Sequence, residues 1–456
     1  MLVLTEYQMQ ACPMVELVFV PFFTSNMPAS TSYELKCLVT RLGISCVIIS
    51  TEPLSHRAYG LWALGLELDI IMDKPVTARQ SAVTSFDEAY GIAQDYADLL
   101  RSYEDLQHRR TTCFLVNSHR RYHPGLSCSL EMIKEIQQKT GCPVTNIVTT
   151  HCDGQWRLPT EIVEQHYHTY NMGYGKVSHS GYHFLDCIYQ FVKAGMSDDK
   201  RPDMAEVISS FVQPNGFLTQ LNSGDYSRLF GAEKYAAVCK YSDEDLESIF
   251  APFGEIDAAI QLTFYRKGEA VALAQANLQH NGFGRRDWLK PGVDLYKGNG
   301  RVRHEMHEIK SGPFQTIVID SRQVHDKHDR PSPGDTTSSN GSEYEVRVFR
   351  NCGILGEDCP LQTFTLADLD RRSDADPPGL YSEGVKRAVL DEAVDFMEGT
   401  RDVGDLKSNL PDHSFPAHVM SAAYISHVRR KMGQNPVVPI KISYGPGAAM
   451  NASISI

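Results

Sequence analysis

The sequence predicts an α/β protein in which a parallel sheet in the N-terminal part is followed by a large, mostly antiparallel open sheet. Up to residue 144, short apolar runs alternate with amphipathic helical patterns, which is typical of βαβ units. Beyond residue 144 the apolar runs are longer and partly alternate with polar residues, which is typical of strands covered by helices on one face. We therefore expect two units, residues 1–144 and residues 145–456.

The first unit is expected to consist of alternating strands and helices. Apolar, β-branched runs predict strands at residues 15–22, 44–50, 68–72 and 111–116. Apolar residues at helical spacing predict helices at residues 29–42, 55–66, 86–101 and 126–139. Gly43 and Gly141 follow the first and the last of these helices, as glycine commonly does at a helix end.

The second unit is expected to contain longer strands, later helices and two loops. Strands are predicted at residues 145–150, 258–265, 270–278, 314–320 and 344–349. Helices are predicted at residues 384–398 and 416–431. Residues 326–342 are rich in Asp, Ser, Pro, Thr and Gly and are predicted to form a mobile loop, and residues 368–379 are similar. We expect residues 445–456 to fray.

Composition and charge exclude several classes of partner. A formal net charge of −12 argues against nucleic acid or an anionic membrane as the main partner, because either requires a basic footprint. A small anionic ligand held by a local Arg/Lys cluster is still compatible with this charge. Eleven cysteines without a CxxC pair predict reduced thiols in a cytoplasmic protein. The sequence shows neither a signal peptide nor an apolar run of about 18 residues that would span a membrane.

A candidate proton-handling site lies between residues 178 and 186. On a helix, His179, His183 and Asp186 stand at positions i, i+4 and i+7 and project from one face. Two imidazoles and a carboxylate in this arrangement can exchange protons with a ligand. The alternative is that they are ordinary polar residues on a half-buried helix.

A lysine follows the predicted strand at residues 68–72. Lys74 stands in the run from Asp73 to Pro75, just past the carboxyl end of that strand. A side chain at this position points into the crevice where α/β proteins hold their ligands. The alternative is a charged turn closed by proline, which is a common way for a strand to end.

Four segments, in this order, resemble one known family. Residues 47–56 are similar to its strand, Thr-Pro turn and His-bearing helix start, and residues 73–75 to its Glu-Lys-Pro signature. Residues 117–124 resemble its Arg-Tyr/Phe-x-Pro segment, and residues 179–186 its Asp-x-Gly-x-His-x-x-Asp helix. The family is the Gfo/Idh/MocA group, named after glucose-fructose oxidoreductase, inositol dehydrogenase and MocA.

The resemblance implies a Rossmann-like nucleotide-binding domain, incomplete at its start, over residues 1–144, and a substrate and oligomerisation domain over residues 145–456. It implies NAD or NADP as cofactor, a small-molecule substrate, and a homodimer or tetramer. The implied catalytic residues are Lys74, His183 and His179. The implied cofactor-binding residues are Thr51, Pro53, His56, Asp73 and Lys74. The implied substrate-binding residues are Arg121, Tyr122 and Asp186.

The chain departs from the family pattern at three places. His179 stands where the family has aspartate, and Asp73 stands where it has glutamate. Residues 1–42 contain no glycine, so they lack the Gly-x-Gly-x-x-Gly turn on which the family holds the cofactor diphosphate. Either the cofactor is held differently, or it is not held, or the start of this chain is altered relative to its relatives.

Two functions are compatible with these features, and a third is a variant of the first. The first is an NAD(P)-dependent oxidoreductase that acts on a hydroxyl or carbonyl of a sugar-like or polyol-like molecule. The second is a non-catalytic relative that serves as a ligand-sensing or protein-binding module. The third is non-redox or internally recycled chemistry at the same site. We expect no metal, although the histidines at 166, 168, 179 and 183 are candidates and residues 304–307 resemble a shortened zincin motif.

Overall fold

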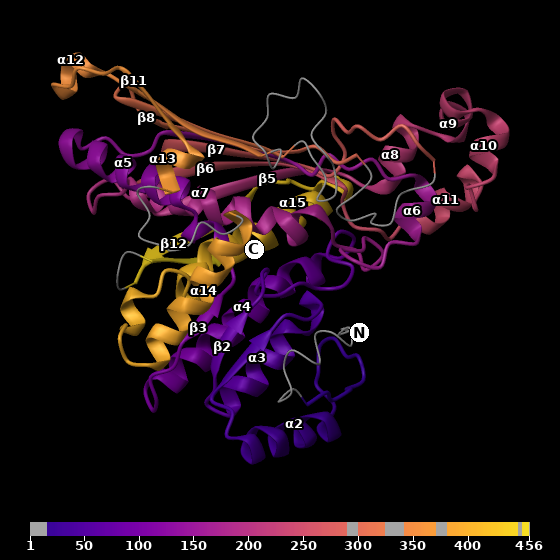
Figure 1. The fold of residues 1–456 in the computed structure, drawn as a ribbon, viewed down its shortest axis with the longest axis horizontal. Helices are drawn as coiled ribbons and strands as arrows, with labels where there is room; N and C mark the ends of the chain where they lie inside the picture. The colour runs from indigo at the N-terminus through magenta and orange to yellow at the C-terminus, as the bar shows by residue number, and fades with distance from the viewer. Residues whose placement is uncertain (1–15, 290–299, 324–341, 371–380, 446–448, 456) are drawn as a thin grey trace.

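The computed structural model describes residues 16–289, 300–323, 342–370, 381–445 and 449–455. In this part of the chain a small parallel sheet is followed by a large, mostly antiparallel sheet, which confirms the predicted α/β class (Figure 1). The small sheet consists, in spatial order, of β1 (Cys46–Ile49), β2 (Asp69–Met72) and β3 (Phe114–Val116).

The small sheet forms where the sequence is almost continuously apolar. Every residue of β2 and β3 is buried, because helices cover both faces, and β1 pairs with β2 alone among the described strands. Residues 16–22 form no strand, so the prediction for residues 15–22 is wrong over the part that is described. Leu17, Val18 and Phe19 are exposed there instead of lying in a sheet.

The helices of this region begin and end at recognisable residues. The hydroxyl of Ser85 accepts the amide of Glu88 at the start of α4, and Gly43 ends α2 in the left-handed conformation with φ 63°. The elements are α2 (Ala29–Leu42), η1 (Pro53–Ser55), α3 (His56–Gly65), α4 (Phe86–Gln107), η2 (His119–Tyr122) and α5 (Pro124–Thr140).

The large sheet has ten strands, and only the β4–β7 pair is parallel among them. Its spatial order is β11-β10-β9-β8-β4-β7-β6-β5-β12-β13. The predicted strands correspond to β4 (Asn146–Cys152), β6 (Asp257–Arg266), β7 (Glu269–Gln279), β9 (Gln315–Gln323) and β10 (Ser342–Arg350). The strands that were not predicted are β5 (Met204–Val212), β8 (Arg303–Ser311), β11 (Leu361–Thr365), β12 (Val438–Tyr444) and β13 (Met450–Ile454).

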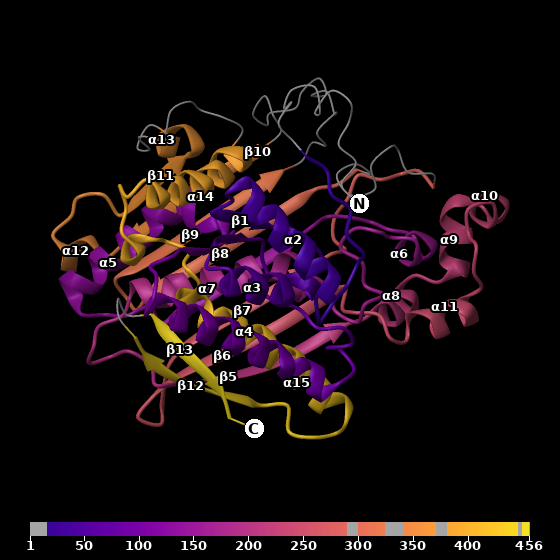
Figure 2. The same ribbon diagram turned by 90° about the horizontal axis from the view of Figure 1, so that it is seen from below.

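Helices fill the space between the two sheets. α15 (Ser414–Lys431) lies between α4 and the large sheet, and α7 (Tyr182–Ala194) packs beside it against the same sheet (Figure 2). α14 (Tyr381–Met397) returns to the small sheet, where Val389 and Ala393 pack on Leu115. One hydrophobic core therefore runs from the small sheet through these helices to the large sheet.

A lobe of short helices projects from one end of the large sheet (Figure 1). Its own core includes Phe217, Leu246 and Phe250. The helices of this lobe are α6 (Pro159–Val163), α8 (Pro214–Gln220), α9 (Ser223–Phe230), α10 (Ala232–Ala236) and α11 (Asp243–Phe250). The remaining short elements are η3 (Val177–Gly181), α12 (Cys352–Leu355), α13 (Leu366–Asp370), η4 (Val403–Asp405) and η5 (Leu410–His413).

The C-terminal end differs from its prediction. Residues 450–454 form β13 rather than a frayed end, because Met450 is buried and its amide donates to the hydroxyl of Tyr189. Residues 326–341 of the predicted mobile loop, and residues 371–379 of the second loop, lie outside the described residues. No helix in the described ranges is both long and apolar enough to cross a bilayer.

Candidate active site

Lys74 lies at the carboxyl ends of the three parallel strands. The amide of Asp73 donates to the carbonyl of Ile49 at the end of β1, and the amide of Asn117 donates to the carbonyl of Met72 at the end of β2. These bonds bring the chain segments that follow β1, β2 and β3 to one edge of the sheet. Lys74 is half-buried there, and its ammonium donates to a backbone carbonyl of the neighbouring helix region.

That carbonyl belongs to His179, which is 3.0 Å from the Lys74 ammonium nitrogen. His179 lies in η3, a turn of π-helix that precedes α7, so residues 179–186 do not form one regular α-helical face as predicted. Single π-helical turns often occur at functional sites. Gly181 makes the turn possible, because a Cβ there would lie 2.7 Å from the carbonyl oxygen of Lys176.

The two predicted histidines have different ring neighbours. The ring of His179 stacks on His168 with centroids 4.7 Å apart. The ring of His183 meets His119 edge to face with centroids 4.5 Å apart. Burial lowers the pKa values of all four imidazoles, and the charge of Lys74 lowers them further.

Burial keeps these imidazoles neutral. It lowers the pKa of His179 to about 3, assisted by the charges of Lys74 and Lys176. Burial also lowers the pKa of His183 well below its usual value, assisted by the nearby His119 and Arg120. His183 is 3% exposed, and its Nδ1 atom has no hydrogen-bond partner. A buried, unpartnered imidazole nitrogen can accept a proton or a hydrogen bond from a ligand.

The predicted substrate residues lie deeper and bind one another. Arg121 forms two hydrogen bonds to Asp186, of 2.5 and 2.9 Å, and Asp412 accepts a further one at 2.7 Å. Ser118 donates to the same carboxylate of Asp186, so both of its oxygens are engaged without an imidazole. Tyr122 donates to Glu392. These side chains fasten the region between η2 and α7 to the segment before α15.

The predicted cofactor residues surround the end of the small sheet. His56 is fully buried, and its two ring nitrogens bind the carbonyls of Pro75 and Thr51 at 2.8 and 3.2 Å. Thr51 itself is exposed, and Pro53 opens η1. Asp73 accepts a hydrogen bond of 3.3 Å from the Asn117 amide, whose own Oδ1 atom is buried without a partner.

The sequence interpretation missed several charged residues of the site. Arg120 pairs with Glu305 of β8 through two hydrogen bonds of 3.0 and 2.7 Å. Lys176 is 1% exposed, and its ammonium binds Asp153 at 2.5 Å and His151 at 2.9 Å. His119 and Arg120 were within reach of sequence reasoning, because they follow β3 directly, as Lys74 follows β2. The partners on β4 and β8 carried no comparable signal.

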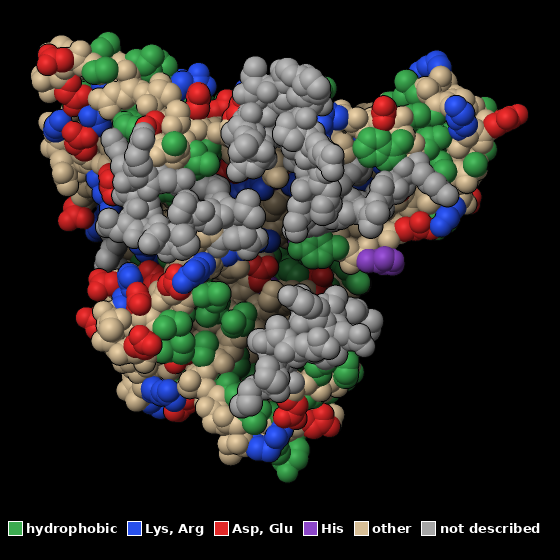
Figure 3. All heavy atoms as spheres, viewed as in Figure 1, with side chains coloured by type: hydrophobic (Ala, Val, Ile, Leu, Met, Phe, Trp, Pro, Cys, Tyr) green, Lys and Arg blue, Asp and Glu red, His purple; other side chains and the backbone are tan. Residues whose placement is uncertain are grey.

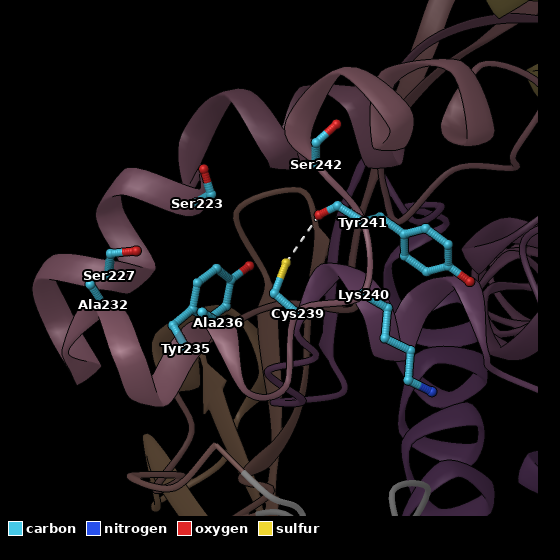
Figure 4. Close-up of a pocket in the computed structure, with 9 residues that line it drawn as sticks. All are labelled: Ser223, Ser227, Ala232, Tyr235, Ala236, Cys239, Lys240, Tyr241 and Ser242. Carbon is cyan, nitrogen blue, oxygen red and sulfur yellow. Dashed lines mark hydrogen bonds between the residues drawn. The ribbon is translucent and has the colours of Figure 1, made fainter.

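A second candidate site is a cavity that lies away from the predicted site residues. A cavity of about 400 Å³ in the helical lobe is lined by the hydroxyls of Ser223, Ser227 and Ser242 and by Cys239, whose thiol donates to the carbonyl of Tyr241 at 3.1 Å (Figure 4). None of the predicted site residues lines it. Among the described residues, no three His, Cys, Asp or Glu side chains gather as they would around a metal ion.

No family model matches the sequence, and no curated protein matches it. Among solved structures, an NAD-binding oxidoreductase from Klebsiella pneumoniae is similar with a TM-score of 0.50 and 13% identity over 87% of this chain and 81% of that chain. An oxidoreductase from Sinorhizobium meliloti has a TM-score of 0.49 and 15% identity over 88% of this chain and 81% of that chain. At a TM-score of 0.50 and 13% identity, the structure from Klebsiella pneumoniae shows similarity of fold alone. The α/β fold of this chain, a small parallel sheet followed by a large, mostly antiparallel sheet, is therefore similar to the fold of that NAD-binding oxidoreductase.

Proposed function

We propose that this protein is an NAD(P)-dependent oxidoreductase of the Gfo/Idh/MocA family that acts on a hydroxyl or carbonyl group of a sugar, polyol or related small molecule. The observation that supports this most is the hydrogen bond from Lys74, at the end of β2, to the carbonyl of His179, which stands four residues before His183 of α7. In this proposal residues 1–144 bind the cofactor. Residues 145–456 supply the substrate site and the contacts of a homodimer or tetramer.

The side chains present suit the proton chemistry of such a reaction. The neutral imidazole of His183 has a buried, unpartnered Nδ1 atom, which can accept the proton of a substrate hydroxyl. The ammonium of Lys74 can stabilise the negative charge that develops on the substrate oxygen. The bound nicotinamide would supply the hydride acceptor. His179 contributes its carbonyl, which holds Lys74, and its ring, which stacks on His168.

The carboxyl edge of the small sheet fits the nicotinamide end of the cofactor. Asn117 presents a buried Oδ1 atom without a partner, and Thr51, Asp73 and Lys74 lie at the same edge. For the diphosphate end of the cofactor, residues 1–42 of this sequence supply no glycine-rich turn, because they contain no glycine.

Nicotinamide binding tests the proposal directly. NADH and NADPH are titrated into the purified protein while the nicotinamide fluorescence is followed, and saturable binding of at least one is expected. Lys74→Ala and His183→Ala should then abolish turnover of the preferred substrate while the fold is kept. The matched controls Lys441→Ala and His166→Ala change exposed residues and should leave turnover unchanged. Turnover that survives in either site variant would contradict the roles assigned here.

A second function is favoured by the N-terminal region. Residues 1–42 lack glycine, and apolar side chains are exposed at Phe19, Phe22 and Ile48, as on a surface that binds another protein. The alternative is a non-catalytic, ligand-sensing or protein-binding module. Failure of both nicotinamides to bind would favour it. A cytoplasmic location stays a prediction for either function, supported by the free thiols of the ten described cysteines.

A further inference from the structure

The π-helical turn η3 begins at a buried carboxyl group. Glu255, which stands two residues before β6, is completely buried. Its Oε1 atom accepts the backbone amide of Val177 at 2.8 Å, and its backbone carbonyl accepts the amide of Lys176, also at 2.8 Å. The first amides of a helix have no partner within the helix. Glu255 therefore caps the start of η3 from a distant part of the chain, as an N-cap residue does from the adjoining one.

A tyrosine of the central helix completes this cap. The hydroxyl of Tyr424, in α15, donates to Oε1 of Glu255 at 2.8 Å and accepts the amide of Gly175 at 3.3 Å. The same hydroxyl is 2.8 Å from the hydroxyl of Ser178. Each of the residues 175–178 is thus bonded to Glu255 or to Tyr424. A Cβ atom on Gly175 would overlap with the carbonyl oxygen of Glu255, so this close approach requires glycine.

The capped residues lead directly to the group that binds Lys74. The amide of His179 donates to the carbonyl of Gly175 at 2.9 Å, and the carbonyl of His179 accepts the Lys74 ammonium at 3.0 Å. Within the described ranges that ammonium has no other hydrogen bond or ion pair. The place of Lys74 therefore depends on the orientation of one peptide group, and a shift of the capped residues would move that group.

Neither Glu255 nor Tyr424 has a surface that a ligand could touch. A ligand would reach the chain from its surface, which is hollowed where the part with the small sheet meets the part with the large sheet (Figure 3). Lys74 is half-buried, whereas the two capping side chains are 0% exposed. Their effect on a ligand would therefore pass through the turn and through Lys74.

Stability alone does not explain a carboxyl group at this place. The Oε2 atom of Glu255 is buried without a partner, and burial raises the pKa of Glu255 to about 7. A buried polar atom that makes no hydrogen bond is unfavourable for folding. The arrangement is better explained by where it holds the turn.

We propose that Glu255 and Tyr424 are positioning residues of the proposed active site, which fix the π-helical turn so that the carbonyl of His179 holds the Lys74 ammonium in place. The inference rests on the proposed function for the chemical use of Lys74. The link from the cap to the ammonium is a property of the fold and can be tested by itself. Loss of the cap should release the ammonium while the protein stays folded.

Competitive acylation of the lysines measures whether the ammonium is held. The full chain is labelled with trace acetic anhydride at pH 7, and mass spectrometry gives the acetylation of Lys74 relative to that of the exposed Lys441. In the wild type Lys74 should react more slowly, because it is half-buried and bound to a carbonyl. Tyr424→Phe and Glu255→Leu should each raise this ratio threefold or more.

Two further variants separate positioning from a general loss of stability. Glu255→Gln keeps an oxygen that can accept the Val177 amide, and the ratio should stay within twofold of the wild type. Its missing charge is a small change, because the wild-type carboxyl has a pKa of about 7 and is partly neutral at the pH of the assay. Ser421→Ala removes another buried hydroxyl of α15, which donates to Ala89, and should leave the ratio unchanged.

The labelling ratio decides the inference. An unchanged ratio in Tyr424→Phe and Glu255→Leu would overturn it, as would an equal rise in Ser421→Ala or in Glu255→Gln. If Glu255→Leu does not fold, as judged by circular dichroism, Tyr424→Phe decides alone, because it removes a single oxygen atom.

Turnover of the same samples separates this inference from the proposed function. If the cap variants release Lys74 but Lys74→Ala keeps its turnover, the proposed function fails and the positioning of the ammonium stands. If Lys74→Ala abolishes turnover, Tyr424→Phe should lower kcat more than it raises KM, since its hydroxyl does not touch the substrate. A change in KM alone would contradict the positioning role.

Discussion

Protonation of His179 should destabilise the protein at mildly acidic pH. The side chain is 6% exposed, and its pKa is lowered to about 3, first by burial and then by the charges of Lys74 and Lys176. In an unfolded chain a histidine titrates near about 6.5. Between these two values the unfolded state binds the proton and the folded state does not. The neutral ring of His179 therefore costs the folded state nothing above about pH 7. The free energy of unfolding falls as the pH drops from about 6.5 toward 3.

The size of the effect follows from the two pKa values. Each pH unit below the unfolded pKa costs about 1.4 kcal/mol, so at pH 5 this one histidine lowers the free energy of unfolding by about 2 kcal/mol relative to pH 8. His179→Gln removes the titrating ring and keeps the carbonyl that binds Lys74. Between pH 8 and pH 5, the free energy of unfolding of the variant should therefore fall by about 2 kcal/mol less than that of the wild type.

Urea unfolding at the two pH values measures this difference. The wild type, His179→Gln and Ser180→Ala are unfolded at pH 8 and at pH 5, and the free energy of unfolding is extrapolated to water. Ser180→Ala is the control, because it changes the adjacent side chain without a titrating group. A difference between the wild type and His179→Gln that is the same at both pH values would refute the assignment of His179 as a buried, neutral imidazole.

Two further substitutions test how the site is supported. Arg121→Met leaves Asp186 and Asp412 without their shared guanidinium and should lower the free energy of unfolding by about 3–5 kcal/mol in urea. A loss below about 1 kcal/mol would show that this buried pair does not fasten η2 to α7. Ser85→Ala removes the oxygen that accepts the Glu88 amide and should cost about 1 kcal/mol. Hydrogen exchange in the first turn of α4 should quicken, and unchanged exchange there would contradict the capping role.

Elements with one strong pattern were predictable from the sequence. β2 follows from four consecutive residues that are all buried, and β7 from strict alternation of exposed and buried side chains. α4 starts at the predicted residue because Ser85 caps it. In each case the local pattern reflects the burial of that segment in the finished fold.

The strand that contributes most charge to the site was not predictable in this way. The inward side chains of β8 include Arg303, Glu305 and His307, and among its buried residues only Ile309 is aliphatic. A strand with charged residues on its covered face has no apolar alternation, so the polarity that builds the site also conceals the strand. The pairing of Arg121 with Asp186 was equally hidden, because it joins η2 to α7 across 65 residues.

The central helix has a mechanical consequence for any ligand. α15 is buried from Ser414 to Val428 and is bonded on both sides: Ser421 donates to Ala89 of α4, and Ser209 of β5 donates to Ala423. It therefore joins α4 to the large sheet through hydrogen bonds as well as through packing, and any change in the spacing of these two layers would have to break those bonds. A ligand bound between the two sheets would lie beside a helix that is held on both sides. Selectivity then depends on size and charge at the moment of entry rather than on closure of the protein around its guest.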